Sequence, residues 1–480
     1  MYECPNCGGN LKFDIPSQQL KCAYCLTTHD PYDITKTQDA DESSDFDVTI
    51  FTCPQCGGEI LSTDTSAAEF CSFCGASTIL DSRISKEKRP THIIPFKQTK
   101  EACKQAYIAR IKHAPFAPDE LKDKEYIDGF RGIYMPYWAY SITQKGPVSL
   151  KGEKTYRKGD YVYTDHYNLE GGLDACYYDL SYDASSSFSD DISQRIAPFY
   201  VKDSKKFTPS YLSGFYADTA DVDSCLYEKD ALKLANTTSY NKIKRTPEFS
   251  GVTFSGKNND FYTTMTLHTY SETPERVLYP VWFMSYRKNG RVAYATVNGQ
   301  NCKVAADIPV DIKKYTLGTL WLAIPIFVLL NFFFTIRPGV LLTCSCFLAI
   351  ASLIVYAWEI MDIYHKDHRT DDRGYLSRRP HKSSAPNDKK TTASLTALMK
   401  SGSADGQRKA PGFIFSLAAV LVCICVWIIN PVSDLWYYVG TVISFIGILL
   451  TIVVVIQKYN VLATQKLPQF ERHGGDDGAK

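Results

Sequence analysis

Half of the sixteen cysteines form four Cys-x-x-Cys knuckles within the first 74 residues. The knuckles are Cys4 and Cys7, Cys22 and Cys25, Cys53 and Cys56, and Cys71 and Cys74. Fourteen residues separate the two knuckles in each half of this segment. A tetrahedral zinc ion takes four ligands, with sulfur at about 2.3 Å, and two short knuckles that face each other supply that geometry. The pattern therefore predicts two zinc ribbons, over residues 1–35 and 50–85, each with one structural Zn2+ ion.

Disulfides are the alternative, but Cys-x-x-Cys repeated at nearly constant spacing is more typical of zinc. Zinc thiolate sites persist where thiols stay reduced, so this interpretation places the N-terminus in the cytosol. The residues before Cys4 have neither the basic nor the apolar region of a secretory signal peptide. Residues 36–49 are acidic and rich in serine, and we expect a solvated linker between the ribbons.

Four long apolar runs fill the C-terminal third of the chain. They are Thr316–Ile336, Val340–Trp358, Phe413–Asn430 and Trp436–Ile456. Each run approaches or meets the roughly 20 residues that a helix needs to cross a bilayer core. Buried core helices are the alternative, but four uncharged runs are hard to explain in that way. The sequence predicts transmembrane helices 1 and 2 within 316–358 and helices 3 and 4 within 413–456.

Basic residues predict the orientation of these spans. The connection 359–412 holds eleven Lys or Arg and the tail 457–480 holds four, whereas the two short outer turns hold one Arg. The positive-inside rule then places the N-terminus, the long connection and the tail in the cytosol of a multi-pass protein of the inner membrane. We expect residues 359–412 to be a disordered basic loop. This loop either rests on anionic headgroups or merely satisfies the orientation rule.

The middle region, residues 90–315, is rich in Tyr and Phe, and we interpret it as a soluble α+β domain. Its strings Ile133–Tyr140 and Val277–Met284 place Pro and Trp in the same register, 144 residues apart. We interpret them as a weak internal duplication. Trp138 and Trp282 would then occupy equivalent places, each packed between sheet and helix of its own half. Residues 161–182 alternate aromatic and polar side chains, which predicts a half-buried antiparallel strand pair.

Several strings together resemble a known bacterial family. They include Ile94–Lys97, Gly132–Trp138, Leu212–Tyr216, Val297–Gln300 and Tyr459–Thr464. The chain resembles multi-pass membrane proteins with twin N-terminal TFIIB-type zinc ribbons, which are sometimes labelled primosomal-helicase-related through the ribbon. No Gly-x-x-x-x-Gly-Lys-Ser/Thr loop is present to hold nucleotide phosphates, so the residues do not support the helicase label. The resemblance implies an envelope-stress role beside a phage-shock-type coat protein.

Charge and the absence of catalytic motifs direct the functional hypothesis. Residues 1–85 carry four basic and thirteen acidic residues, a net charge of −9, which argues against nucleic acid as a partner. His166 beside Asp165 could form a base, although a hydrogen-bonded pair in a sheet is the commoner arrangement. Closed Cys4 shells leave no open coordination position for catalysis. We assign no catalytic residue and expect a protein that is not an enzyme.

The fold class we expect is multidomain: two zinc ribbons, a soluble α+β domain with weak internal duplication, and a four-helix transmembrane region. The function we expect is a membrane-anchored adaptor or scaffold that recruits cytosolic proteins to the inner membrane. Two alternatives remain open. One is a membrane-associated nucleic-acid-binding protein, and the other is a hydrolase with its site in the aromatic domain.

Overall fold

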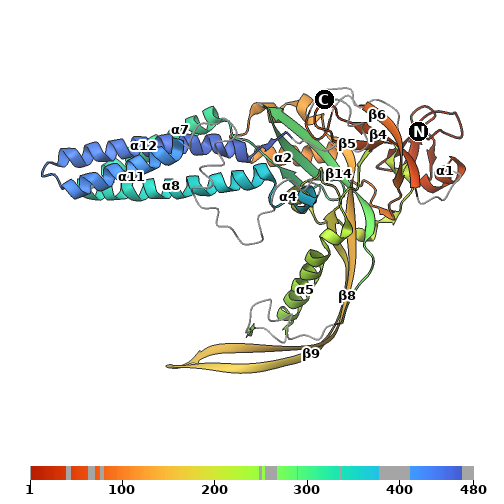
Figure 1. Ribbon diagram of the computed structural model, residues 1–480, viewed down its shortest axis with the longest axis horizontal. Coiled ribbons are helices and arrows are strands. Elements are labelled where there is room, and N and C mark those ends of the chain that lie inside the picture. Colours follow the sequence, from red (N-terminus) through yellow and green to blue (C-terminus); the bar gives the residue numbers. More distant parts are fainter. Residues whose placement is uncertain are drawn as a thin grey trace.

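A computed structural model describes residues 2–38, 45–62, 71–75, 81–247, 251–254, 268–288, 290–333, 337–377 and 411–467. Three parts are visible: a head built on a large mixed sheet, a bundle of long helices, and a two-stranded arm that leaves the head (Figure 1). The arm and the helices project from the head, and the N-terminal ribbon lies at the end of the head farthest from the helix bundle (Figure 1).

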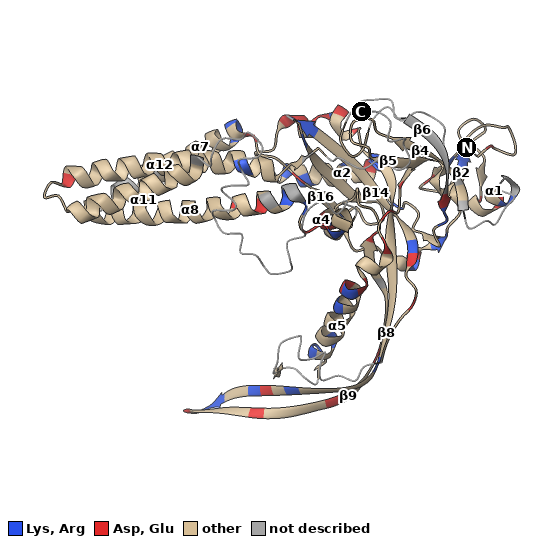
Figure 2. Cartoon of the chain, in the orientation of Figure 1, with Lys and Arg blue, Asp and Glu red and all other residues tan. Residues whose placement is uncertain are grey.

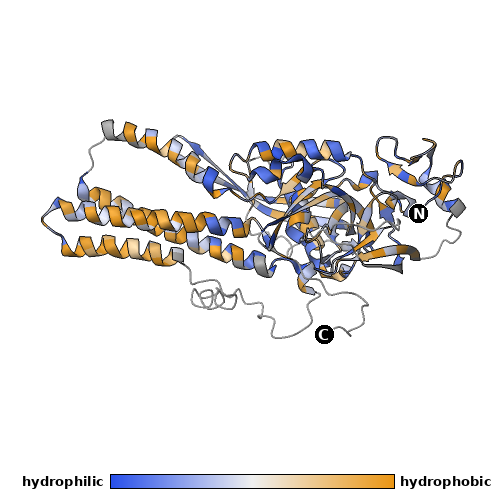
Figure 3. Cartoon of the chain, turned by 90° about the horizontal axis from the view of Figure 1, so that it is seen from above, coloured by the Kyte–Doolittle hydropathy of each residue, from blue (hydrophilic) through white to orange (hydrophobic). Residues whose placement is uncertain are grey.

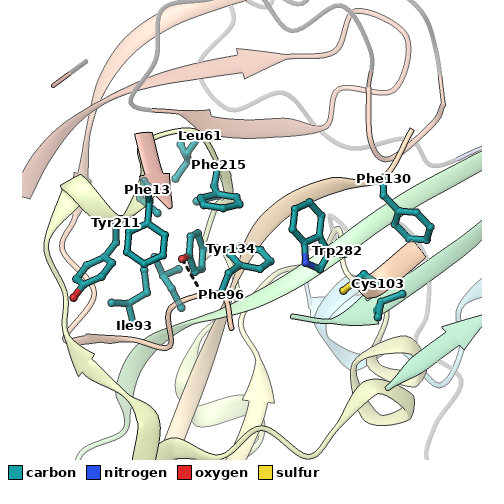
Figure 4. Close-up of a cluster of buried hydrophobic side chains, with 14 of the residues drawn as sticks. Phe13, Leu61, Ile93, Phe96, Cys103, Phe130, Tyr134, Tyr211, Phe215 and Trp282 are labelled. Atoms are coloured by element: carbon teal, nitrogen blue, oxygen red, sulfur yellow. Dashed lines mark hydrogen bonds between the residues drawn. The ribbon is translucent and has the colours of Figure 1, made fainter. Parts of the chain in front are cut away.

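The first ribbon is a small sheet docked on the head. It contains β1 (Leu11–Asp14), β2 (Gln19–Cys22) and β3 (Thr28–His29), followed by α1 (Pro31–Gln38). Phe13 of β1 packs against Tyr211 and Phe215 of the head, with ring centroids 5.3 and 6.4 Å away (Figure 4). Helix α1 runs past the predicted boundary at residue 35, and β4 begins at residue 45. The predicted linker 36–49 is therefore ordered at both ends, and residues 39–44 lie outside the described residues.

The second ribbon is part of the main sheet. The sheet has a central path of eight strands: β10 (Lys205–Lys206), β7 (His92–Ile93), β14 (Glu275–Lys288), β8 (Arg131–Lys158), β11 (Tyr216–Asp218), β5 (Glu59–Ser62), β4 (Asp45–Thr52) and β6 (Asp81–Lys88). Strand β11 joins the two regions, because it pairs with β8 on one side and β5 on the other. The structure thus differs from the predicted boundary between 50–85 and 90–315: a ribbon strand with an open edge gains hydrogen bonds by joining the larger sheet.

Strands β8 and β14 form the centre of the head. They pair antiparallel, with Met135 opposite Tyr279. In this register a two-fold rotation about the pair carries residues 131–139 of β8 onto residues 275–283 of β14, so that Pro136 matches Pro280. Beyond them, β15 (Arg291–Asn298) pairs with β14, and both β16 (Val304–Ala306) and β17 (Gln465–Lys466) pair with β15. This is the arrangement that a duplicated strand would give.

The two tryptophans share one face of the sheet, but their contacts are reciprocal. The Trp282 indole donates a hydrogen bond to the Gln98 carbonyl (3.0 Å), just ahead of α2 (Lys100–Lys112). The Trp138 indole donates to the Val222 carbonyl (2.8 Å), ahead of α5 (Glu228–Lys244). Each tryptophan therefore reaches the segment before the other half's helix. The expectation that each packs within its own half is wrong.

Aromatic rings fill the core on the ribbon side of the sheet. Phe96 stacks on Phe215 with a centroid distance of 4.5 Å and contacts Trp282 and Tyr134 at 5.1 and 4.9 Å (Figure 4). On the opposite face, Tyr137 stacks on Tyr279 beneath the short helix α4 (Asp190–Ile196). The rings tie ribbon 1, the strands and α2 into one core, which explains the high Tyr and Phe content.

Three helices are long and apolar enough to cross a membrane in the part of the chain that the structure describes. The spans are Pro338–Ile363 in α8 (Pro338–His368), Gly412–Ile429 in α11 (Pro411–Ile429) and Asp434–Leu462 in α12 (Asp434–Leu462). These helices pack on one another and are apolar along most of their length (Figure 3). The expected first span begins in helix α7 (Ile312–Phe333), which is not among the three, and residues 334–336 lie outside the described residues.

The predicted disordered loop 359–412 is wrong over its first part. Helix α8 continues through 359–368, and α9 (Arg373–Ser377) follows. The Arg373 guanidinium donates to the Leu226 carbonyl (2.7 Å) and contacts Asp230, and Lys366 lies 3.4 Å from Asp307. These contacts anchor basic residues that the composition alone presents as solvated. Residues 378–410 lie outside the described residues.

The arm is the hairpin of β8 and β9 (Tyr161–Asp183), which have 28 and 23 residues. The turn at Gly159 has φ 64°, a value that glycine adopts without cost. Residues 161–182, expected to form a strand pair among themselves, instead form one strand that pairs with β8, from Lys158 opposite Tyr161 to Tyr137 opposite Asp183. The outer half of this strand is exposed rather than half-buried.

Candidate metal centres

The knuckle cysteines form two groups of four, as the spacing predicts. In each group the sulfur atoms all lie within 4.8 Å of one another. The short sulfur–sulfur separations are 3.6 Å for Cys4–Cys25, 3.5 Å for Cys7–Cys22, 3.8 Å for Cys53–Cys74 and 3.7 Å for Cys56–Cys71. A tetrahedron with metal–sulfur bonds of about 2.3 Å has edges of about 3.8 Å. Both groups therefore fit a tetrahedral metal ion, and neither has the sulfur–sulfur distance of about 2.0 Å of a disulfide.

Backbone hydrogen bonds shape each first knuckle in the same way. In ribbon 1, the amide of Cys4 donates to the Gly9 carbonyl (2.7 Å) and that of Gly8 donates to the Cys4 carbonyl (2.8 Å). In ribbon 2, the amides of Cys53 and Gly57 make the matching bonds at 2.9 and 2.8 Å. The turn requires a left-handed residue after the second cysteine, where Gly8 and Gly57 have φ of 72° and 73°.

In the second knuckle of each ribbon, the residue after the second cysteine differs between the two ribbons. Gly75 follows Cys74 with φ 68°, whereas Leu26 follows Cys25 with φ 62°. A side chain in this conformation costs roughly 1–2 kcal/mol, because Cβ crowds the following carbonyl oxygen. Ribbon 1 therefore contains local strain at Leu26 that ribbon 2 avoids at the matching position, Gly75.

Burial separates the two centres. All four cysteines of ribbon 2 are at most 2% exposed, whereas Cys7 and Cys25 of ribbon 1 are exposed. Phe73, between two ribbon 2 ligands, packs near Phe283, and its carbonyl accepts a hydrogen bond from Tyr294 (2.6 Å). Ribbon 2 is thus enclosed by the head. Ribbon 1 exposes one side, where Tyr24 and Leu26 are 77% and 65% exposed.

Hydrogen bonds among the four thiols of a Cys4 group show why the group favours a bound cation. A hydrogen bond from Cys71 lowers the pKa of Cys53 to about 6. The hydrogen bonds of Cys71 with Cys53, Cys56 and Cys74 hold the pKa of Cys71 well above its usual range. Four sulfur atoms this close cannot all ionise unaided, and a bound divalent cation removes that conflict by deprotonating the coordinating thiols.

His29 is a neighbour of the first centre that the knuckle spacing did not predict. Its Nε2 lies 3.6 Å from Cys4 Sγ and 3.1 Å from Thr27 Oγ1. Thr27 Oγ1 in turn lies 3.0 Å from Cys25 Sγ. Thr27 and His29 both follow Cys25 within four positions in the sequence. Their closeness to a predicted ligand is the signal from which their place beside the centre could have been inferred. They can hydrogen-bond thiolate sulfur, which orients metal ligands.

The structure does not bring the candidate base of the aromatic domain into a site. His166 lies on the arm with its side chain 74% exposed, and its Nδ1 is 3.2 Å from Glu153 Oε1. Asp165 is the adjacent residue of the same strand, so its side chain points to the opposite face. The expected His166–Asp165 pair is therefore wrong.

Comparison with known proteins gives one relative and no family. The chain is 26% identical over 318 residues to the uncharacterized protein YdjG of Bacillus subtilis (strain 168), which covers 65% of this chain and 91% of that protein. No protein-family profile matches, and no solved structure is significantly similar.

Proposed function

We propose that the chain is a four-span membrane protein whose head binds two structural zinc ions and recruits a cytosolic protein through ribbon 1. Zinc is the metal that tetrahedral Cys4 sites typically hold. The observation that carries the proposal is the contrast between the two centres. Ribbon 2 is enclosed by the head, whereas ribbon 1 lies at the far end of the head (Figure 1) and exposes the side chains of Tyr24 and Leu26.

The connections at the head end of the bundle support four crossings. Helix α7 begins at the head, where Tyr315 packs against Phe116 with centroids 5.2 Å apart. Helix α8 begins at the opposite end and returns to the head, where α9 docks. Residues 312–337 connect these two points in the sequence, and we therefore assign α7 as the fourth span.

The same contacts support a topology in which the head, the connection 359–412 and the tail 457–480 lie on one side of the membrane. Arg291 of β15 donates to the Val461 and Thr464 carbonyls (2.8 and 2.9 Å), which fixes the end of α12 to the head. With α9 also docked, the chain after α8 and after α12 lies on the head side. The excess of basic residues in 359–412 and 457–480 then assigns that side to the cytosol of an inner membrane.

An exposed aromatic and aliphatic pair on a small, metal-fixed turn suits protein recognition. Aromatic residues are enriched at binding hot spots, and a rigid surface loses little entropy on association. The resemblance suggests a phage-shock-type coat protein as a partner to test. The acidic charge of residues 1–85 supports a protein partner over nucleic acid, and the exposure of His166 gives no support to a hydrolase.

The test is photo-crosslinking in cells with benzoylphenylalanine at position 24, compared with position 200. Tyr200 is a matched control, because it is 53% exposed and lies elsewhere on the head. We expect a defined protein adduct at 24 that is lost with Leu26→Ser while zinc content is unchanged. Equal adducts at both positions, or salt-dependent retention of DNA by the purified protein, would contradict the adaptor proposal.

A further inference from the structure

The inner half of the arm has one apolar face, which helix α5 and a short strand cover. Near the head, Val148, Leu150 and Leu169 of this face pack against Phe254, with Tyr240 and Ile243 of α5 beside them. Strand β12 (Thr253–Phe254) pairs with β8 at Gly152, where an added Cβ would lie 2.4 Å from Val252. Among the described residues the pairing with β12 ends at Glu153, and Lys154 opposite Asp165 follows on the same face as Leu150.

The same face continues beyond its cover as a cluster of tyrosines. Tyr156 lies opposite Tyr163 and stacks on it at 5.6 Å, and Lys158 lies opposite Tyr161. Side chains alternate along a strand, so these residues share the face of Leu150. Tyr156, Tyr161 and Tyr163 are 44%, 72% and 45% exposed. Three exposed tyrosines add little stability to an isolated hairpin, and an exposed apolar cluster of this kind marks a surface that a partner covers.

The position of the tip identifies that partner. The arm leaves the head, bends, and runs in the direction of the helices, so that its tip lies level with the bundle rather than with the head (Figures 1 and 2). A bilayer around α8, α11 and α12 extends sideways from them at this level. If these helices span the membrane, as proposed above, the tip meets the leaflet nearer the head.

The chemistry of the tip fixes the depth of that contact. The outer edges of a two-stranded hairpin carry backbone groups without strand partners, which hydrocarbon cannot satisfy. Tyrosine, by contrast, is enriched at the membrane–water interface. Residues 154–163 also carry Lys154, Arg157 and Lys158 against Asp160, and basic side chains near the surface attract anionic lipid.

We propose that the arm is a second membrane contact: its tip, residues 154–163, sits in the headgroup layer of an anionic bilayer on the head side. The contact fixes the head against the membrane at a distance from the helix bundle. It rests on the proposed spans, and it concerns a lipid surface rather than a protein.

Photo-crosslinking to lipid tests the proposal with the full-length chain in nanodiscs that contain phosphatidylglycerol. Benzoylphenylalanine is placed at 161 or 163 in the tip, at 178 near the base of the same arm, and at 436 in α12. Tyr178 is 60% exposed and is the matched control, and Trp436 is 59% exposed and reports on the spans. We expect lipid adducts at 161, 163 and 436, and background at 178.

The outcomes are distinct. Lipid adducts at 436 without adducts at 161 and 163 would overturn the arm contact and leave the spans intact. Protein adducts at 161, either to a second copy or to the head, would overturn it in favour of a protein surface. Absence of lipid at 436 would overturn the spans and the arm contact together. In discs of phosphatidylcholine alone, the yield at 161 should fall while that at 436 is unchanged, and an unchanged yield at 161 would refute the anionic preference.

Discussion

Truncation of Trp282 to alanine should destabilise the head about twice as much as truncation of Trp138. Trp282 is 5% exposed, its ring lies 5.1 Å from Phe96 and 6.2 Å from Phe215, and its indole satisfies the Gln98 carbonyl. A buried ring of this size costs about 3–5 kcal/mol when removed. Trp138 is only partly buried and has the Arg276 guanidinium 5.4 Å from its ring, so we expect about half that cost.

Scanning calorimetry of the full-length chain in detergent measures the difference. One kcal/mol shifts the melting temperature of a domain of 150–250 residues by about 2–4 °C, so Trp282→Ala should lower it by roughly 6–20 °C and Trp138→Ala by roughly half as much. Trp282→Phe keeps a ring but removes the donor to Gln98, and should cost about 1–3 kcal/mol. Equal losses for the two alanine variants, or a larger loss for Trp138→Ala, would refute the asymmetric packing.

Three further outcomes follow from the ribbons and the buried acid. Leu26→Gly relieves roughly 1–2 kcal/mol of strain against an entropic cost of about 0.5–1 kcal/mol, so zinc release from ribbon 1 to a chelator should slow; faster release would contradict the strain. Cys7→Ser should abolish a fast phase of zinc release, because ribbon 1 is the more exposed centre, whereas Cys56→Ser should leave that phase intact and lower the melting temperature of the head, because ribbon 2 belongs to the main sheet. Burial raises the pKa of Asp218 from 3.8 to about 7, so its contribution to stability is greatest below pH 4 and falls as pH rises towards 7; Asp218→Asn should reduce that slope in urea titrations at each pH, and an unchanged slope would contradict it.

Ligand chemistry made the two groups of four cysteines predictable from sequence. A tetrahedral shell restricts both residue type and spacing, so eight cysteines in four knuckles are enough to identify both groups. The difference in burial between them was not predictable, because it depends on β11. That strand has three residues and lies more than 150 positions after Ile60 and Leu61 in the sequence. It pairs with these two residues on one side and with β8 on the other. No local pattern around residue 60 signals such pairing.

Alternation predicted one local feature correctly, but neither charge nor alternation predicted the tertiary contacts. The basic residues at the end of α8 and just after it looked solvated, because the sequence does not show that Asp307 lies close to Lys366 or that Asp230 lies close to Arg373. Alternation in residues 161–182 correctly indicated a strand. It did not show that the partner is β8, or that the outer half extends away from the head, since one strand's pattern does not identify its neighbour.

We expect each Cys4 group to hold one zinc ion in the folded head. Full-length protein purified under reducing conditions should contain two zinc ions per chain by plasma mass spectrometry, one for each group of thiols within 4.8 Å. Cys25→Ser should retain one ion, because it leaves the ribbon 2 shell complete. A zinc content near zero in the unsubstituted protein, or two ions retained in Cys25→Ser, would contradict the account.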